Sequence, residues 1–332
     1  MKLLKRLYSI HSKSGKEQKM IKFLLWWIRT NIPGARVELD KKVGNIYVTK
    51  GVSDTYPCIV SHIDQVQEVH SRDFKAIETH DIIFGWSPKK KEFQGLGADD
   101  KNGIWIALKC LEKFDALKAA FFVGEEIGCV GSSKADMDFF TDCRFVLQCD
   151  RRGSNDFITS ICASELCSTD FIAATDFEMF GYHLEDGAMT DVLTLKENGL
   201  SVSCVNMSCG YYDPHTDNEF TVKADLLNCL AFVEHIIENC TQVYPHEYDY
   251  YAGFGSRFDE FYYDWYEEFY ELLQLHPDIT IDQLESAFQG YMPKINRNDL
   301  EMTFEMVKQD LQYAEIEKDY EYYGTLRDSE QP

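Results

Sequence analysis

The sequence predicts an α/β protein with a largely parallel sheet, and three observations support this class. Strand-like and helix-like segments take turns along residues 57–239, which is the order that strand–helix–strand units produce. The strand-like segments are short and apolar, as buried strands are. The chain has 332 residues, of which 45% are hydrophobic, so it is long enough for a substantial core and about two domains.

Two helices are expected at the start, over residues 2–12 and 15–31, separated at Ser14-Gly15 and ended by Pro33-Gly34. Residues 36–49 then alternate like a pair of strands with a turn at Gly44-Asn45. The remaining elements are predicted in this order: strand 57–63, helix 101–115, strands 118–124, 143–149 and 156–162, helix 189–198, strand 201–207 and helix 222–239. Ligands of such sheets bind beyond the carboxyl ends of the strands, so functional residues are expected there.

The chain changes in composition near residue 241. Residues 241–332 contain 6 basic and 21 acidic residues, a net charge of −15, whereas residues 1–240 carry only −8. Residues 244–270 contain 13 aromatic residues among 27, and residues 282–323 are helical in composition. We expect a main domain over 1–240 and a helical appendage over 241–332, held against the main domain by those aromatic side chains.

Charge and cysteine content exclude several classes of protein. A net charge of −23 opposes binding to nucleic acid or to an anionic membrane surface. The eleven cysteines include no Cys-x-x-Cys pair, which argues against a thiolate zinc site and a disulfide framework and favours a reducing compartment. The longest apolar run near the start, residues 23–28, is too short for a signal peptide or a membrane span. A cytoplasmic location is therefore expected.

Acidic residues and histidines follow several of the predicted strands. They are His62 with Asp64, Asp99, Glu125 with Glu126, Asp150, and His215. Each alone has an ordinary structural explanation: a turn, a solvated helix start or a helix cap. Together they are more specific, because strand 118–124 leads directly into two carboxylates and strand 143–149 leads into a third.

Carboxylates and imidazoles without thiolates suit zinc, manganese or cobalt in a hydrolytic site. Two divalent ions would be balanced by three carboxylate ligands and one hydroxide, which leaves one carboxylate free to carry a proton. The glycine-rich segment 95–103 fits neither a phosphate-binding loop nor a calcium loop, because it lacks the required spacing and places Lys101 at a ligand position.

Five segments, in this order, resemble the motifs of dinuclear zinc exopeptidases. They are Ser61-His62-Ile63-Asp64, Gly97-Ala98-Asp99-Asp100-Lys101-Asn102-Gly103, Glu125-Glu126-Ile127-Gly128-Cys129-Val130-Gly131-Ser132, Asp150, and Pro214-His215-Thr216-Asp217-Asn218-Glu219. The superfamily includes peptidase T, the glutamate carboxypeptidases and the bacterial leucyl aminopeptidases, and the resemblance covers about residues 3–240. It implies a three-layer fold: a mixed, mostly parallel sheet with helices on both faces.

The resemblance also implies a site for two divalent ions, with zinc favoured and cobalt or manganese as alternatives. Asp99 would bridge the ions, about 3.5–4 Å apart as in other two-metal hydrolases. His62 and Asp150 would complete one site, and Glu126 and His215 the other.

The same resemblance implies two catalytic roles and one backbone feature. Asp64 would hold the ring and tautomer of His62. Glu125 would be the general base that takes a proton from the water bridging the metals and passes it to the leaving amine. The peptide bond between Asp99 and Asp100 is expected to be cis.

Substrate contacts are harder to predict. Arg151, Asp191 and Tyr212 are candidates, with Arg152 beside the first, Glu219 as a further supporting carboxylate and Tyr211 as a second hydroxyl near the last. Only 64 residues separate Asp150 from His215, too few for the lid domain of peptidase T or the glutamate carboxypeptidases, so a form without a lid is expected.

The predicted function is therefore hydrolysis of a peptide bond in a small peptide, as an aminopeptidase or other exopeptidase. One alternative is hydrolysis of another amide, such as an N-acyl amino acid. A second is a catalytically silent interaction protein of the same fold. Homo-oligomerisation is compatible with all three.

Overall fold

The computed structural model describes residues 1–161 and 164–248. Beyond these it describes residues 269, 272–274, 276–277, 279–288, 297, 300–301, 304–305, 307–308 and 311. The chain divides into two compact units, Met1–Gly253 and Phe254–Pro332. The predicted division at residues 240 and 241 stays a prediction.

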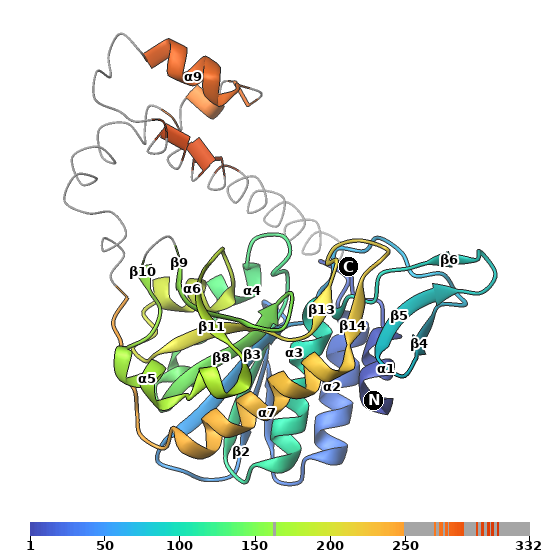
Figure 1. The fold of residues 1–332 in the computed structure, drawn as a ribbon. Helices are drawn as coiled ribbons and strands as arrows, with labels where there is room; N and C mark the ends of the chain where they lie inside the picture. Colours follow the sequence, from blue (N-terminus) through green and yellow to red (C-terminus); the bar gives the residue numbers. More distant parts are fainter. Residues whose placement is uncertain are drawn as a thin grey trace, which may run out of the picture. The chain divides into compact units, whose positions relative to one another are not determined.

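In the first unit the described residues form a nine-stranded sheet (Figure 1). Its strands, in spatial order, are β1 (Arg36–Leu39), β2 (Ile46–Lys50), β7 (Leu117–Phe122), β3 (Tyr56–His62), β8 (Cys143–Arg151), β12 (Cys204–Ser208), β9 (Asp156–Ile161) and β10 (Ser164–Glu165), with β11 (His183–Gly187) also pairing with β9. Strand β3 runs parallel to both β7 and β8, and β12 runs parallel to β8. The strands outside this parallel centre, β2 and β9, pair antiparallel with it. The predicted mixed, mostly parallel sheet is confirmed.

Helices cover both faces of this sheet (Figure 1). The described helices of the first unit are α1 (Lys2–Tyr8), α2 (Gln18–Asn31), α3 (Ala98–Lys113), α4 (Val130–Ser133), α5 (Thr169–Ala174), α6 (Asp191–Glu197) and α7 (Lys223–Asn239), with 3-10 turns at Met137–Phe140 and Phe177–Phe180. Helix α3 packs on β3 and β8 from one face, together with α1 and α7, and α6 packs on β3, β8 and β12.

Two separate hydrophobic cores produce the three layers, because side chains alternate between the faces of a strand. Ile59 and Phe121 lie in the larger core, with side chains of α1, α2, α3 and α7. Their neighbours Val60 and Phe122 lie in the smaller core on the other face, with Val192 of α6. Strands buried on both faces must be apolar throughout, which is why these segments are recognisable in the sequence.

A second, five-stranded sheet among the described residues was not predicted. Its strands are β13 (Tyr211–Tyr212), β14 (Phe220–Val222), β5 (Ile82–Ser87), β4 (Lys75–Glu78) and β6 (Glu92–Phe93). Four of these strands have two to four residues, and only β5 is long enough for its alternation of buried and partly buried positions to form a recognisable pattern. His215 lies in the loop between β13 and β14. The pairing of β14 with β5 holds the end of that loop in the second sheet.

The second unit has a small core of its own. Its described helix α9 spans Ile281–Phe288, and six described side chains form a buried cluster: Phe269, Leu273, Leu284, Leu300, Phe304 and Val307. Of the aromatic residues in 244–270, Tyr244 belongs to the core of the first unit. Residues 249–268 lie outside the described residues, so the predicted packing of most of those aromatic side chains stays a prediction.

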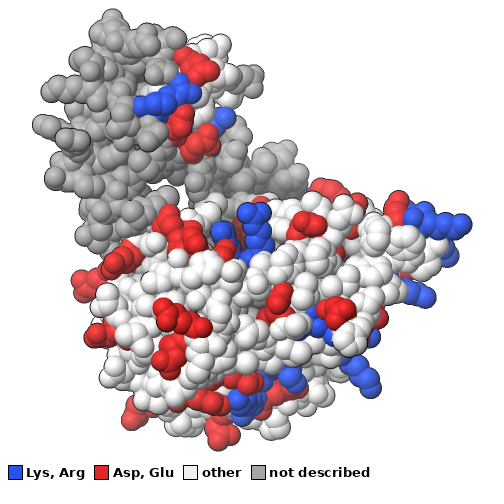
Figure 2. Space-filling view, viewed as in Figure 1, with Lys and Arg blue, Asp and Glu red and all other residues white. Residues whose placement is uncertain are grey.

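Acidic side chains are spread over the visible face of the first unit, and lysines and arginines lie at its β5–β6 end and in smaller groups elsewhere on that face (Figure 2). Among the described residues no helix is both long and apolar enough to cross a membrane. All ten described cysteines are buried and unpaired.

Candidate active site

The predicted site residues meet at the carboxyl ends of neighbouring strands. His62 is the last residue of β3, Glu125 and Glu126 follow β7, and Asp150 lies near the end of β8. Asp99 is the second residue of α3. Three adjacent parallel strands thus deliver their terminal side chains to one edge of the sheet, as the α/β rule requires.

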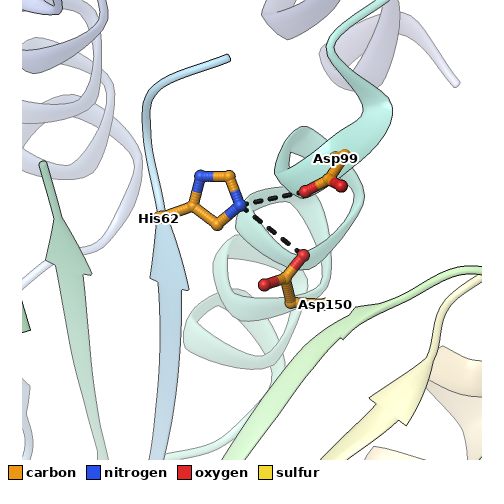
Figure 3. A group of neighbouring side chains, drawn as sticks. All are labelled: His62, Asp99 and Asp150. Atoms are coloured by element: carbon orange, nitrogen blue, oxygen red, sulfur yellow. Dashed lines mark hydrogen bonds and ion pairs between the residues drawn. The ribbon is translucent and has the colours of Figure 1, made fainter. Parts of the chain in front are cut away.

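One cluster contains His62, Asp99 and Asp150 (Figure 3). The Nε2 atom of His62 lies 3.0 Å from Oδ1 of Asp99 and 3.5 Å from Oδ1 of Asp150. Each residue offers one ligand atom, and these atoms all lie within 4.8 Å of one another, a spacing that one metal ion can span.

A second cluster contains Asp99, Glu126 and His215. The Nε2 atom of His215 lies 3.3 Å from Oδ2 of Asp99 and 3.0 Å from Oε2 of Glu126. Asp99 therefore belongs to both clusters and turns a different oxygen toward each histidine. Its peptide bond to Asp100 is cis, as expected.

The chemistry of these five residues fits two divalent cations. Three carboxylates and two imidazoles are hard and borderline donors of the kind that zinc, cobalt and manganese accept. The side chains of four of these residues are buried or nearly so, and the side chain of His215 is half exposed. Oε1 of Glu126 is buried, and no described polar group hydrogen-bonds to it. A buried carboxylate oxygen needs a partner, and a cation would supply one.

Asp64 connects the two histidine-bearing halves of the site. Its Oδ1 lies 3.4 Å from Nδ1 of His62, on the side of the ring opposite to the clusters. The carboxylate also accepts hydrogen bonds from the backbone N–H groups of Glu125 (3.0 Å) and Glu126 (3.2 Å) and from the hydroxyl of Ser14 (2.7 Å). Asp64 thus orients the ring of His62 and the start of the Glu125-Glu126 segment together.

Glu125 is adjacent to the clusters but belongs to neither. Its Oε2 lies 3.9 Å from Nε2 of His62, and its Oε1 accepts a long S–H contact of 3.7 Å from Cys129. Burial raises the pKa of Glu125 well above its usual value, although the nearby imidazole of His62 opposes this. A carboxyl with a raised pKa, close to the candidate ligands, has the properties of a proton carrier.

The histidines hold protons tightly without a metal. Hydrogen bonds to Asp99 and Glu126 raise the pKa of His215 to about 11. Burial disfavours the charged form of His62, but the charges of Asp150 and Glu125 outweigh this and raise its pKa. Burial likewise opposes ionisation of Asp99, yet the hydrogen bonds with His215 and His62 lower its pKa. Protons on the two histidines thus balance part of the negative charge of the clustered carboxylates.

The clusters open into a hollow of about 360 Å³. Its lining includes Arg151, Arg152 and Tyr211, besides Thr190, Asn206, Ile158 and the segment 187–189. Arg152 and Pro214 also line an adjoining hollow of about 550 Å³. A peptide or another small amide fits such a volume.

The residues predicted to contact substrate differ in their positions and in their hydrogen-bond partners. Arg151 lines the first hollow but donates from Nε to Asp156 over 3.0 Å. Tyr212 lines the adjoining hollow, and its hydroxyl donates to Oδ2 of Asp225 over 2.7 Å. Tyr211 instead donates to Oδ1 of Asp150 over 3.4 Å. Asp191 is fully buried behind the site, and burial raises its pKa to about 6.

Two polar residues that hold Asp150 were not identified from the sequence. Nε2 of Gln148 donates to Oδ2 of Asp150 over 3.0 Å. The side-chain amide of Asn206 accepts the backbone N–H of Asp150 and donates to its backbone carbonyl, both at 2.9 Å. Gln148 also approaches Oδ2 of Asp191 at 3.5 Å, which joins Asp191 indirectly to the cluster. A lone glutamine or asparagine in a strand carries no signal of such a role.

No model of a known protein family matches the sequence, and no curated protein matches it. Solved structures do match. The aminopeptidase PepT of Bacillus cereus is 16% identical, with a TM-score of 0.58, over 73% of this chain and 98% of that one. A Staphylococcus aureus tripeptidase is 16% identical, with a TM-score of 0.56, over 71% and 96%. The TET1 peptidase of Pyrococcus horikoshii, which assembles into a tetrahedron or a large octahedral shell, is 14% identical, with a TM-score of 0.52, over 70% and 98%.

The chain therefore has the fold of the zinc exopeptidases, as its motifs predicted. At this level of identity the likeness concerns the fold.

Proposed function

We propose that this chain is a metal-dependent exopeptidase that removes amino-terminal residues from small peptides. The observation that carries the proposal is the pair of three-residue clusters that share Asp99, with Glu125 beside them. This arrangement lies at the sheet edge of a fold that aminopeptidases and a tripeptidase also have. Asp191 and Arg151 remain proposed as indirect contributors to substrate binding.

His62 and Asp150 would hold one divalent ion, and Glu126 and His215 would hold the other, with Asp99 between them. When bound, such ions polarise an amide carbonyl and make water more acidic. Zinc is the metal we propose, since carboxylate and imidazole donors suit it.

The residues of the chain account for the remaining chemistry. Glu125 accepts a proton from the attacking water and delivers it to the leaving amine, for which its raised pKa is suited. The carboxylate of Asp64 faces Nδ1 of His62 at 3.4 Å and would favour the tautomer whose Nε2 is free to bind a metal ion. Tyr211 lines the hollow, and we propose that its hydroxyl turns from Oδ1 of Asp150 to donate a hydrogen bond to a substrate oxygen.

The second candidate is hydrolysis of an N-acyl amino acid by the same residues. Arg152 favours a substrate that carries a carboxylate, and both a short peptide and an N-acyl amino acid meet that requirement. A catalytically silent protein is the third candidate. The presence of all five candidate ligands in two compact clusters argues against loss of function.

A substrate panel separates the three candidates. Zinc-loaded and chelator-treated protein should be assayed on a tripeptide, its N-acetylated form and an N-acetyl amino acid. We expect zinc-dependent release of the first residue from the free tripeptide and little cleavage of the N-acetylated form. Preferential cleavage of the N-acetyl amino acid would favour the second candidate, and inertness toward all three compounds would favour the third.

Homo-oligomerisation is also proposed for this chain, since the TET1 peptidase assembles through copies of the same fold. Light scattering coupled to gel filtration measures it directly.

A further inference from the structure

The carboxylate of Glu219 binds the loop that leads into Asp99. Glu219 directly precedes β14 and is almost fully buried. Its Oε2 accepts the backbone N–H of Gly97 at 2.6 Å, and its Oε1 accepts those of Ala98 at 3.1 Å and Asp99 at 3.3 Å. One side chain thus satisfies three consecutive backbone donors, 120 to 122 residues away in the sequence.

Lys101 binds the same loop through its carbonyl side. Its side chain is fully buried, and Nζ donates to the carbonyl of Leu96 over 3.1 Å and to Oε1 of Gln65. The space around the loop is tight, since a Cβ atom at Gly97 would lie 2.8 Å from Nζ of Lys101. Two buried side chains, one acidic and one basic, therefore hold residues 96–99. Glu219 binds three backbone N–H groups of this loop, and Lys101 binds one of its carbonyls.

We propose that Glu219 and Lys101 are positioning residues that preorganise Asp99 for metal binding. The inference rests on the proposed function to the extent that Asp99 is a metal ligand. Neither side chain belongs to the two candidate clusters, so each acts through the loop rather than on a metal.

Glu219 and Lys101 together form a clamp on residues 96–99. Through its position in the sequence, Glu219 also links this loop to the segment that carries His215. His215 lies four residues earlier, in the loop between β13 and β14. When Glu219 holds the backbone of Asp99, it also fixes the distance between the segment that carries Asp99 and the segment that carries His215. Oδ1 of Asp217, between them, accepts the N–H of Gly95 at 3.2 Å and supports the same alignment.

Three substitutions in the full-length chain test this proposal. Glu219→Gln keeps the size but leaves one acceptor oxygen for three N–H donors. Glu219→Asp keeps the charge but shortens the side chain by one methylene. Glu38→Gln, at an exposed residue of β1, controls for loss of one negative charge.

Two properties should be measured: hydrogen exchange of the 95–101 amides in metal-free protein, and zinc affinity by competition with a chelator. We expect both Glu219 variants to exchange about tenfold faster in this segment and to bind zinc about 10- to 100-fold more weakly. The Glu38 variant should behave like the unmodified protein. If Glu219→Asp matches the unmodified protein in both measurements, charge alone matters and the positioning role is wrong.

Lys101→Met provides an independent test should the Glu219 variants fail to fold. Removing a positive charge near bound cations strengthens their binding on electrostatic grounds alone. Positioning predicts the opposite, a loss of about tenfold or more in zinc affinity with faster exchange of the loop. Unchanged or tighter binding would overturn the proposal. If the unmodified protein binds no zinc, the proposed function fails, whereas the exchange rates of metal-free protein still decide whether the clamp exists.

Discussion

Glu125 and Glu126 are adjacent in the chain, yet their carboxylates face different histidines. Oε2 of Glu126 lies 3.0 Å from Nε2 of His215, whereas Oε2 of Glu125 lies 3.9 Å from Nε2 of His62. Only Glu126 belongs to a candidate metal cluster. Successive side chains that leave a strand point in different directions, so the pair divides naturally into one ligand and one proton carrier.

This division predicts different outcomes for two matched substitutions. Glu125→Gln keeps the shape but removes the proton acceptor, so turnover of a peptide should fall by about 10²–10⁴-fold while metal content is retained. Glu126→Gln should lower metal content as well. Metal analysis and steady-state kinetics on the same preparations check both. Full activity of the Glu125→Gln protein would exclude its assigned role.

Asp64→Asn should weaken metal binding although Asp64 contacts no predicted metal position. The substitution removes the negative charge that faces Nδ1 of His62 and puts a donor where two backbone N–H groups now donate. We expect zinc affinity to fall by about 10- to 100-fold, as for other residues that orient metal-binding histidines. Competition with a chelator measures the change. Ser14→Ala, which removes one of the hydrogen bonds to Asp64, should have a smaller effect in the same direction.

The stability of metal-free protein should decrease as the pH rises above neutrality. His215 has a pKa of about 11 in the folded chain and about 6.5 when unfolded, so its ion pairs stabilise fully below pH 6.5 and are lost progressively toward pH 11. The clustered carboxylates then repel one another without compensation. Bound zinc replaces the protons, so the loaded protein should resist this loss.

Thermal unfolding at pH 6 to 9, with zinc or with a chelator, measures that difference. The gap between the two midpoints should widen as the pH rises, because zinc must displace protons from the histidines at low pH. His215→Asn should make the unfolding midpoint of the metal-free protein less dependent on pH. A gap that narrows with rising pH would contradict the assigned ion pairs.

Arg152, rather than Arg151, should recognise a substrate carboxylate. Arg151 is paired with Asp156, whereas Arg152 makes no ion pair with any described residue and lines both hollows. Arg152 directly follows β8 and lines the same hollow as Asp150. A tripeptide should therefore be cleaved about 10- to 100-fold more efficiently than its carboxy-terminal amide.

Arg152→Gln should abolish that preference, and Arg29→Gln, at an exposed residue of α2, should preserve it. The ratio of kcat/KM for the two peptides is the measurement. Loss of the preference in Arg151→Gln instead would assign the role to the other arginine.

The sheet was predictable from local patterns, whereas the candidate ligands were assigned through the resemblance of five ordered motifs to those of zinc exopeptidases. Strands β3, β7 and β8 are mostly buried, and each ends at or just before a polar side chain at the sheet edge. The contacts of the supporting residues were not predictable in this way, even for Glu219, which was predicted as a supporting carboxylate. Gln148 donates a hydrogen bond to the side chain of Asp150 on the same strand, which no sequence pattern indicates. Glu219 accepts hydrogen bonds from a loop more than a hundred residues away in the sequence. The second sheet was missed because its strands are short and reach their hydrogen-bond partners only through tertiary pairing.

The central claim is that Asp99 bridges two metal ions. Crystals of the zinc-loaded full-length protein, measured on both sides of the zinc absorption edge, test it directly. We predict two anomalous peaks, one beside His62 and Asp150 and one beside Glu126 and His215, with one oxygen of Asp99 facing each. A single peak, or none after zinc loading at neutral pH, would contradict the account.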